Sequence, residues 1–435
     1  MKAKHPKELF ILALSEMCER YAFWGVGFML VLYLIGYYEY ENAQATNIYG
    51  IFSGCATFLP LIGGYIADRW NYRTPLWLGA LVNAVGCFML ATGIHSLLYF
   101  ALFIIACGYG LFTPSILTVL GHVYHDRPTL REAGFSIYYA AINVGVFLAL
   151  ISLGLIAQQV SWNAAFFCSG VVQLVGMAPT FWILKKYRGT YHALHALKKE
   201  SKGHKLTKVE RDRIVVILVA SFFSILFWIA YNQGFSSLSI FAKDFTDRMI
   251  LGWEIPPSWI LSSESLGLVI LAPILARLYA HLQKRDRDPS PMNKISLSLL
   301  FIALCFSVMV WASYPIPENA QTAAVNPFFP LFAFFLMAIG EMLLMPIGLS
   351  LITQLAPRHL TALFVGIAYL CVGVAFYLGG MLAGFMERVG GLFHFFAIFV
   401  VLTFIPAIIL FFLAPKLTHL SHRHVQTPPP DETGL

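Results

Sequence analysis

Charged residues are scarce in this sequence. Asp, Glu, Lys and Arg make up 12% of the 435 residues, whereas hydrophobic residues make up 58%. A soluble protein carries roughly 25% charged residues, so this chain has too few to cover a surface that faces water. The apolar runs approach the roughly 20 residues of a membrane helix and do not alternate as β-barrel strands do. We therefore expect an all-α membrane protein.

Motifs for covalent chemistry are missing as well. The seven cysteines lie inside apolar runs without CxxC spacing, which argues against a disulfide framework and a metal site. The sequence has no Walker motif for ATP and no HExxH motif for a membrane protease. We therefore expect that the chain is not an enzyme and has no catalytic residue, no metal and no bound cofactor.

Twelve apolar runs are long enough to cross a bilayer. They lie at about 9–36, 45–66, 75–94, 97–120, 134–157, 164–184, 214–240, 258–281, 294–314, 328–352, 360–386 and 391–413. Because the number of spans is even, both ends of the chain are expected on the same side of the membrane.

The distribution of Lys and Arg predicts which side that is. Of the 29 basic residues, twenty-four lie at the chain ends or in the loops on their side, and the opposite loops hold only Lys243, Arg248 and Arg388. The positive-inside rule therefore puts both termini in the cytoplasm. The same clustering accounts for the net charge of +7 without a nucleic-acid partner. The predicted location is the inner (cytoplasmic) membrane of the cell, where the lipid bilayer surrounds the protein.

The longest basic stretch joins the sixth and seventh spans and divides the chain in two. We expect a six-helix bundle at 1–184, a basic cytoplasmic linker at 185–213, a second six-helix bundle at 214–418 and a disordered tail at 419–435. Two such bundles are typical of transporters that rock around a site near the bilayer midplane. A channel or a membrane-embedded enzyme with twelve helices is the alternative.

Ionisable residues deep inside the apolar runs are few. They are Glu16, Glu19, Arg20, Glu264 and Glu341. Glu16, Arg20 and Trp24 are four residues apart, so they share one helix face, which we expect to border a cavity between the bundles. Four carboxyl groups share one cation, and an apolar environment disfavours the charged form of the others. We infer coupling to protons; the alternative is a fixed Glu16–Arg20 ion pair that pins the first helix.

The motifs that carry these residues match a known family. The run from Glu16 to Gly25 resembles the ExxERFxYYG signature of the proton-dependent oligopeptide transporters, a branch of the major facilitator superfamily. Four further stretches resemble the family in the same order. They are Gly63–Arg69 with Arg73, Ala133–Tyr139 with Ile142–Gly145, Phe227–Trp228 with Gln233–Gly234, and Gly340–Glu341 through Pro357. The resemblance covers nearly the whole chain and implies the major facilitator fold.

The resemblance also implies roles for individual residues. Glu16, Glu19 and Arg20 would couple protons, and Arg20 would bind the substrate carboxylate through its planar fork of donors. Asn143 would hydrogen-bond the peptide, and Glu341 would attract its ammonium group. The other expected substrate contacts are Trp24, Thr57, Trp228 and Tyr369, with core packing as the alternative for Trp228. The expected gating loop comprises Asp68, Arg69 and Arg73.

Three positions that depart from the family pattern concern charge. Thr113 stands where relatives have a lysine, and Asn232 stands where they have an acid, and in relatives these two can form an ion pair between the halves. We expect a neutral Thr113–Asn232 hydrogen bond instead, which should respond less to pH. Glu264 stands where relatives have an asparagine. We expect Glu264 to join Glu341, and either to favour a cationic end of the substrate or to act as a second proton carrier. All three residues are expected substrate contacts.

These observations predict a symporter that uses a proton gradient to import di- and tripeptides. Its expected partners are a small peptide substrate and protons, and it is expected to work as a monomer. One alternative is a member of the same family that carries another small zwitterionic or anionic metabolite, because several cavity positions depart from the pattern. Another is a peptide sensor that does not transport. An efflux antiporter would move its substrate in the opposite direction.

Overall fold

The computed structural model describes residues 5–69, 73–124, 128–180, 206–285, 287, 289–318, 320–357 and 360–421. This part of the chain is almost entirely helical. Its elements are α1 (Lys7–Tyr37), α2 (Asn42–Arg69), α3 (Arg73–Ala91), η1 (His95–Leu97), α4 (Leu98–Val123), α5 (Pro128–Gln159), α6 (Trp162–Met177), α8 (Lys208–Tyr231), η3 (Asn232–Phe235), α9 (Ser237–Asp244), β1 (Met249–Ile250), β2 (Trp253–Glu254), α10 (Pro257–Lys284), α11 (Pro291–Ser313), α12 (Phe328–Leu355), α13 (Thr361–Ala383) and α14 (Leu392–Leu420).

The helices have the length and composition of membrane spans. Within the described ranges, eleven helical runs are long and apolar enough to cross a membrane. The remaining predicted span corresponds to α6, whose described part is a shorter apolar helix. Large apolar side chains point away from the protein, among them Phe412, which is 76% exposed. Such an apolar surface suits lipid. Helices also satisfy their own backbone groups there, as a membrane-spanning segment must. The prediction of an all-α membrane protein is confirmed.

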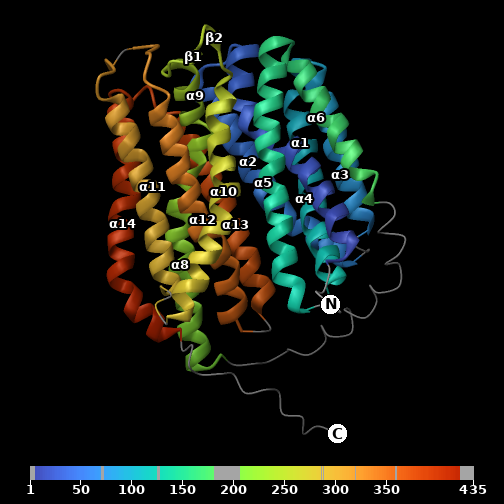
Figure 1. Cartoon of the computed structure of the whole chain (residues 1–435), viewed down its shortest axis with the longest axis vertical. Helices are drawn as coiled ribbons and strands as arrows, with labels where there is room; N and C mark the ends of the chain where they lie inside the picture. The colour runs from blue at the N-terminus through green and yellow to red at the C-terminus, as the bar shows by residue number, and fades with distance from the viewer. Residues whose placement is uncertain are drawn as a thin grey trace.

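The helices form two bundles that lie side by side (Figure 1). Helices α1 to α6 pack on one another, and α8 to α14 do the same. The bundles meet where α2 packs on α13 and where α5 packs on α10. The start of α8 and the end of α14 lie at one end of the molecule, whereas β1 and β2 lie at the other (Figure 1). We call these the terminal end and the hairpin end.

The predicted span at 214–240 is broken, which corrects the prediction of one continuous helix. Helix α8 stops at Tyr231, a 3-10 turn follows, and Ser236 leaves the helical region before α9 begins. Serine hydroxyl groups compensate the interrupted backbone pattern: Ser236 Oγ donates to the Asn232 carbonyl at 3.1 Å, and Ser239 Oγ donates to the Gly234 carbonyl at 2.9 Å. A broken helix is tolerated inside a membrane protein where such groups satisfy its backbone.

Close backbone contacts seal the hairpin end between the bundles. On α2 and α13, a Cβ added to Gly380 would lie 2.4 Å from the Gly50 Cα, so position 380 admits only glycine at this helix separation. On α5 and α10, Ser258 Oγ donates to the Leu150 carbonyl at 2.7 Å, and Trp259 Nε1 donates to the Ile151 carbonyl at 3.0 Å. These contacts hold the two halves together at this end.

The predicted loops fall partly outside the described residues. Asp68 and Arg69 end α2 and Arg73 begins α3, but the loop 70–72 between them lies outside. Most of the predicted linker 185–213 also lies outside, and its last residues belong to α8. Of the predicted tail 419–435, the first two residues continue α14 and residues 422–435 lie outside.

Candidate functional site

A cavity of about 390 Å³ lies between the two bundles. It is bordered by α1, α2, α4 and α5 of the first bundle and by α8, η3 and α10 to α13 of the second. Its lining extends toward the terminal end, where Ile217 of α8, Ile352 of α12 and Val365 of α13 contribute side chains. The hairpin end is sealed. The cavity therefore has one open direction, toward the end where α14 finishes.

Most of the predicted substrate contacts line this cavity. They are Arg20, Trp24, Thr57, Thr113, Asn143, Trp228, Glu264, Glu341 and Tyr369. Asn232 is the exception: it is fully buried in η3 against α13 and lies outside the lining. Both polar atoms of its side-chain amide are buried without a hydrogen-bond partner among the described residues. The predicted Thr113–Asn232 pair is thus not formed in this conformation.

Arg20 is held in place by the first bundle. Its Nε donates to Glu16 Oε1 at 2.7 Å, and its Nη2 lies 2.6 Å from the same oxygen. Nη2 also donates to Thr113 Oγ1 at 3.2 Å, and the guanidinium stacks over the Tyr109 ring at 4.9 Å. These contacts through Nε and Nη2 orient the planar group at the cavity wall.

Glu16 and Glu19 lie behind Arg20 and do not border the cavity. Glu19 is fully buried, with Oε2 3.4 Å from Arg20 Nε and Oε1 accepting from Asn83 Nδ2 of α3 at 3.4 Å. Oε2 of Glu16 is buried without a hydrogen-bond partner among the described residues. The prediction that Glu16, Arg20 and Trp24 all face the cavity is therefore only partly correct. Arg20 and Trp24 reach the cavity, whereas the Glu16 carboxylate turns into the first bundle.

The opposite wall of the cavity carries two acids. Glu264 of α10 and Glu341 of α12 are both buried, and the Tyr231 hydroxyl of α8 lies 2.9 Å from an oxygen of each. Ser265 Oγ donates to the second oxygen of Glu264 at 3.2 Å. The structure thus places Glu264 beside Glu341, as the sequence predicted. The second bundle therefore presents two carboxyl groups to the cavity, opposite the guanidinium group of Arg20.

Aromatic rings close the cavity toward the hairpin end. Phe235 of η3 packs closely against Phe28 of α1, with ring centroids 3.9 Å apart and the rings tilted by 33°, and its ring centroid lies 5.3 Å from that of Trp24. Trp228 packs edge-on against Phe376 of α13. These five rings come from both bundles and form an apolar layer, which we call the ceiling. The rings of the two bundles would have to separate if the hairpin end opened.

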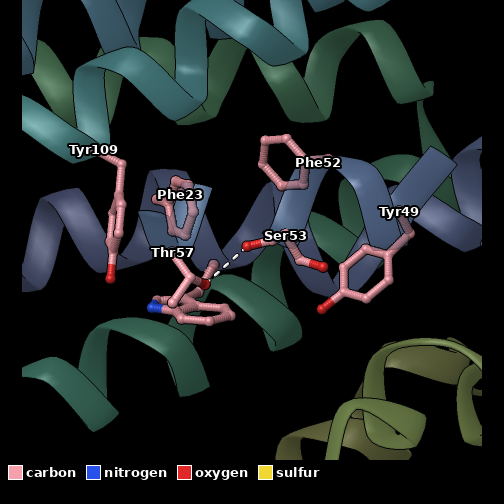
Figure 2. Close-up of a pocket in the computed structure, with 8 residues that line it drawn as sticks. Phe23, Tyr49, Phe52, Ser53, Thr57 and Tyr109 are labelled. Atoms are coloured by element: carbon pink, nitrogen blue, oxygen red, sulfur yellow. Dashed lines mark hydrogen bonds between the residues drawn. The ribbon is translucent and has the colours of Figure 1, made fainter. Parts of the chain in front are cut away.

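A smaller pocket lies beside the ceiling, on the side of α2 (Figure 2). Figure 2 shows Phe23 and Tyr109 lying together on one side of it and Tyr49 on the other. Thr57 donates to the Ser53 carbonyl at 2.8 Å (Figure 2). The volume of about 10 Å³ admits about one water molecule. Thr57 lines both this pocket and the main cavity, so the two are neighbours on α2.

Several lining residues were missed by the sequence analysis. Tyr231, Tyr109, Tyr139, Phe28 and Phe235 all border the cavity. A signal was present for four of them: Tyr109, Tyr139 and Phe28 lie four residues from Thr113, Asn143 and Trp24, and Tyr231 follows Trp228 by three residues. Phe235 lies in η3, where the predicted helix is broken, so helical spacing gave no signal for it.

A family model and similar proteins agree on the kind of protein. The model described as Major Facilitator Superfamily matches residues 12–329. The peptide transporter YePEPT of Yersinia enterocolitica is 26% identical, with 88% of each chain covered. Dipeptide and tripeptide permease B of Shigella dysenteriae is also 26% identical, with 88% of this chain and 87% of that protein covered.

A solved structure extends the likeness to three dimensions. The crystal structure of a mutant of the peptide transporter POT in complex with alafosfalin has 25% sequence identity and a TM-score of 0.85, and 96% of each chain is covered. The resemblance to proton-dependent oligopeptide transporters that the motifs predicted is therefore confirmed, and so is the two-bundle fold. The similar proteins are transporters and not enzymes.

Proposed function

Because the chain belongs to the major facilitator superfamily, we propose that it imports di- and tripeptides together with protons by alternating access. The observation that carries this proposal is the placement of a guanidinium group and two carboxyl groups on facing walls of one cavity. Arg20 lies on α1, whereas Glu264 and Glu341 lie on α10 and α12. A peptide is a zwitterion, so its carboxylate and ammonium ends match these walls.

The first bundle would hold the carboxylate end. Arg20 is oriented by Glu16 and Thr113, so little conformational entropy is lost when it binds a substrate. Asn143 lines the same cavity and would contribute hydrogen bonds to the peptide backbone. Trp228 and Tyr369 would contact the side chains. The peptide transporters named above share the overall fold that supports this assignment.

Proton coupling follows from the balance of charges. The four buried acids outnumber Arg20, which is the one basic residue among the cavity-lining residues that the structure describes. A charged carboxyl group inside a membrane protein is costly unless it is paired. We therefore assign the protons to Glu19 beside Arg20 and to the pair of Glu264 and Glu341. A substrate carboxylate that binds Arg20 would compete with Glu16 and Glu19 and so would favour their protonation.

In alternating access, the cavity would open at one end while the other end is sealed, and then the reverse. The sealed hairpin end and the lining that extends toward the terminal end describe one of the two states. With the termini in the cytoplasm, as the basic residues predict, this state faces inward, and the protein lies in the inner membrane. A functional monomer, as the sequence predicts, is part of this proposal.

Uptake of dialanine into proteoliposomes tests the proposal. An inwardly directed proton gradient should make wild-type protein accumulate the peptide above its external concentration, most strongly at acidic external pH. Glu19→Gln should abolish accumulation driven by the gradient but keep exchange of peptide for peptide. Glu41→Gln, which removes an exposed acid at the hairpin end, is the matched control. Equal accumulation with and without a gradient in the wild type contradicts proton symport.

The same assay separates the alternatives. A carrier for another small zwitterion or anion would show competition by that metabolite and none by dipeptides. Binding of peptide without accumulation would identify a sensor, and movement only out of the vesicles would identify an efflux antiporter. Thr113 and Asn232 depart from the pattern of the peptide transporters, so a carrier of another metabolite is the second candidate function.

A further inference from the structure

Tyr231 forms a bridge between two buried acids. Its hydroxyl oxygen lies 2.9 Å from Glu264 Oε1 and 2.9 Å from Glu341 Oε2. A tyrosine hydroxyl has one hydrogen, so it can donate to only one of these carboxylates. The second short contact is a hydrogen bond only if the other carboxyl group is protonated and donates to the phenol oxygen. The geometry is therefore that of a carboxyl pair that shares one proton through Tyr231.

No basic residue neutralises this pair among the lining residues that the structure describes, apart from Arg20 on the far wall. The groups that face the pair are hydroxyls, an amide and the distant guanidinium. They are Tyr231 of α8, Ser265 of α10, Tyr139 and Asn143 of α5, and Arg20 of α1. Because Arg20 is already paired with Glu16, one negative charge on the second bundle remains unbalanced even when the pair holds its proton.

The opposite bundle presents an unused hydroxyl group toward the pair. The Tyr139 hydroxyl is buried without a hydrogen-bond partner among the described residues. It borders the same cavity and lies within electrostatic range of both Glu341 and Glu264. A buried hydroxyl is more stable with a hydrogen-bond partner, so a donor group of a ligand in the cavity would be stabilised by this oxygen.

We propose that this site, formed by Tyr231, Glu264 and Glu341 and referred to below as the diacid site, selects peptides whose first residue carries a second positive charge. The inference rests on the proposed peptide transport. The α-ammonium of an ordinary peptide satisfies one carboxylate and leaves the shared proton on the other. A lysine side chain at the first position brings a second ammonium group, which replaces that proton. Each ammonium has three donors, so both carboxylates and the Tyr139 oxygen can be satisfied.

The replacement has a consequence for pH. Binding of lysyl-alanine releases one proton that binding of dialanine retains, so the two affinities depend differently on pH. Each unit of rising pH should favour lysyl-alanine over dialanine by up to tenfold, as long as the pair is protonated in the empty protein. Alanyl-lysine has its extra charge at the carboxyl end, near Arg20, and should show no such gain.

Competition against uptake of labelled dialanine tests the proposal in proteoliposomes. The concentrations of lysyl-alanine and alanyl-lysine that halve uptake are measured at pH 5.5, 6.25 and 7.0, a range in which the amino groups of the peptides stay protonated. Wild-type protein should prefer lysyl-alanine, increasingly so toward pH 7. Glu264→Gln removes one acid of the diacid site and should reduce this preference at least tenfold and make it independent of pH. Glu318→Gln, an exposed acid outside the spans, should retain it.

The outcomes separate the two proposals. If dialanine is not taken up at all, peptide transport itself is contradicted, and this inference fails with it. If dialanine uptake is normal but lysyl-alanine shows no preference that depends on pH, only the assignment of the diacid site is overturned. A preference that persists in a folded Glu264→Gln protein also overturns it. Should that variant fail to fold, the wild-type comparison of lysyl-alanine with alanyl-lysine decides alone.

Discussion

Replacing Gly380 by alanine should open the sealed hairpin end. The added Cβ would lie 2.4 Å from Gly50 Cα, 2.7 Å from Gly50 N and 2.8 Å from the Thr46 carbonyl oxygen. All three atoms belong to the backbone of α2, so no side-chain rotation can relieve the overlap. Because carbon atoms in contact are about 3.5–4.0 Å apart, α2 and α13 must separate by roughly 1 Å.

The size of the effect follows from packing energies. Overfilling a packed contact costs about 1–3 kcal/mol, and this cost falls on the state in which the hairpin end is sealed. At about 2 kcal/mol, the ratio of sealed to open protein would fall roughly 30-fold. Transport requires both states in turn, so dialanine uptake should slow down by a similar factor if return to the sealed state limits the cycle.

Distance measurements across the hairpin end test this prediction. Asn42 of α2 donates to the Glu387 side chain beyond α13 at 2.6 Å, and both residues border the sealed contact. Spin labels carried by unnatural amino acids at these two positions avoid the seven native cysteines. Pulsed electron paramagnetic resonance should show a longer distance in Gly380→Ala.

The matched control lies on the same helix. A Cβ at Gly366 would meet only the Leu61 side chain at 3.6 Å, an ordinary contact, so Gly366→Ala should keep the wild-type distance and uptake. An unchanged distance in Gly380→Ala would refute the reasoning. An equal change in both variants would refute it too.

Three further changes have defined outcomes. Arg20→Lys should weaken dipeptide binding about 10- to 100-fold by calorimetry, because lysine lacks the planar fork that pairs with Glu16 and a substrate carboxylate at once; equal affinity would contradict the assigned role. Phe235→Ala removes a buried ring from the ceiling and should lower the free energy of unfolding, measured by denaturation in detergent, by about 3–5 kcal/mol. A loss smaller than that caused by Phe412→Ala, which removes an exposed ring, would contradict the packing. Tyr231→Phe removes the hydroxyl bridge of the diacid site and should alter the pH dependence of dialanine uptake while the melting temperature stays near wild type; an unchanged pH profile would contradict the shared proton.

The sequence predicts the fold and much of the cavity because both depend on simple periodicities. Apolar run length predicted the membrane spans, and the four-residue spacing of Glu16 and Arg20 predicted that they share a helix face, where the structure pairs them at 2.6 Å. The same spacing did not predict that Glu16 turns away from the cavity. Which side of a helix meets the partner bundle depends on tilt and rotation, which neighbouring helices determine.

Contacts between spans were predicted only where motifs pointed to them. The resemblance placed Glu264 near Glu341, but nothing in the sequence indicated that Tyr231 bridges them. The break at Asn232–Phe235 was missed for a similar reason. The apolar run continues through it without proline, and the break depends on serine hydroxyls that satisfy the backbone in the folded protein.

Proton movement caused by peptide alone is the most direct test of symport. Wild-type protein is reconstituted into vesicles that contain a pH-sensitive dye, with equal pH on both sides and no electrical potential. Addition of dialanine outside should acidify the interior, at a rate that follows peptide entry measured in parallel. Peptide entry without acidification would contradict the central claim that this cavity moves peptide and protons together.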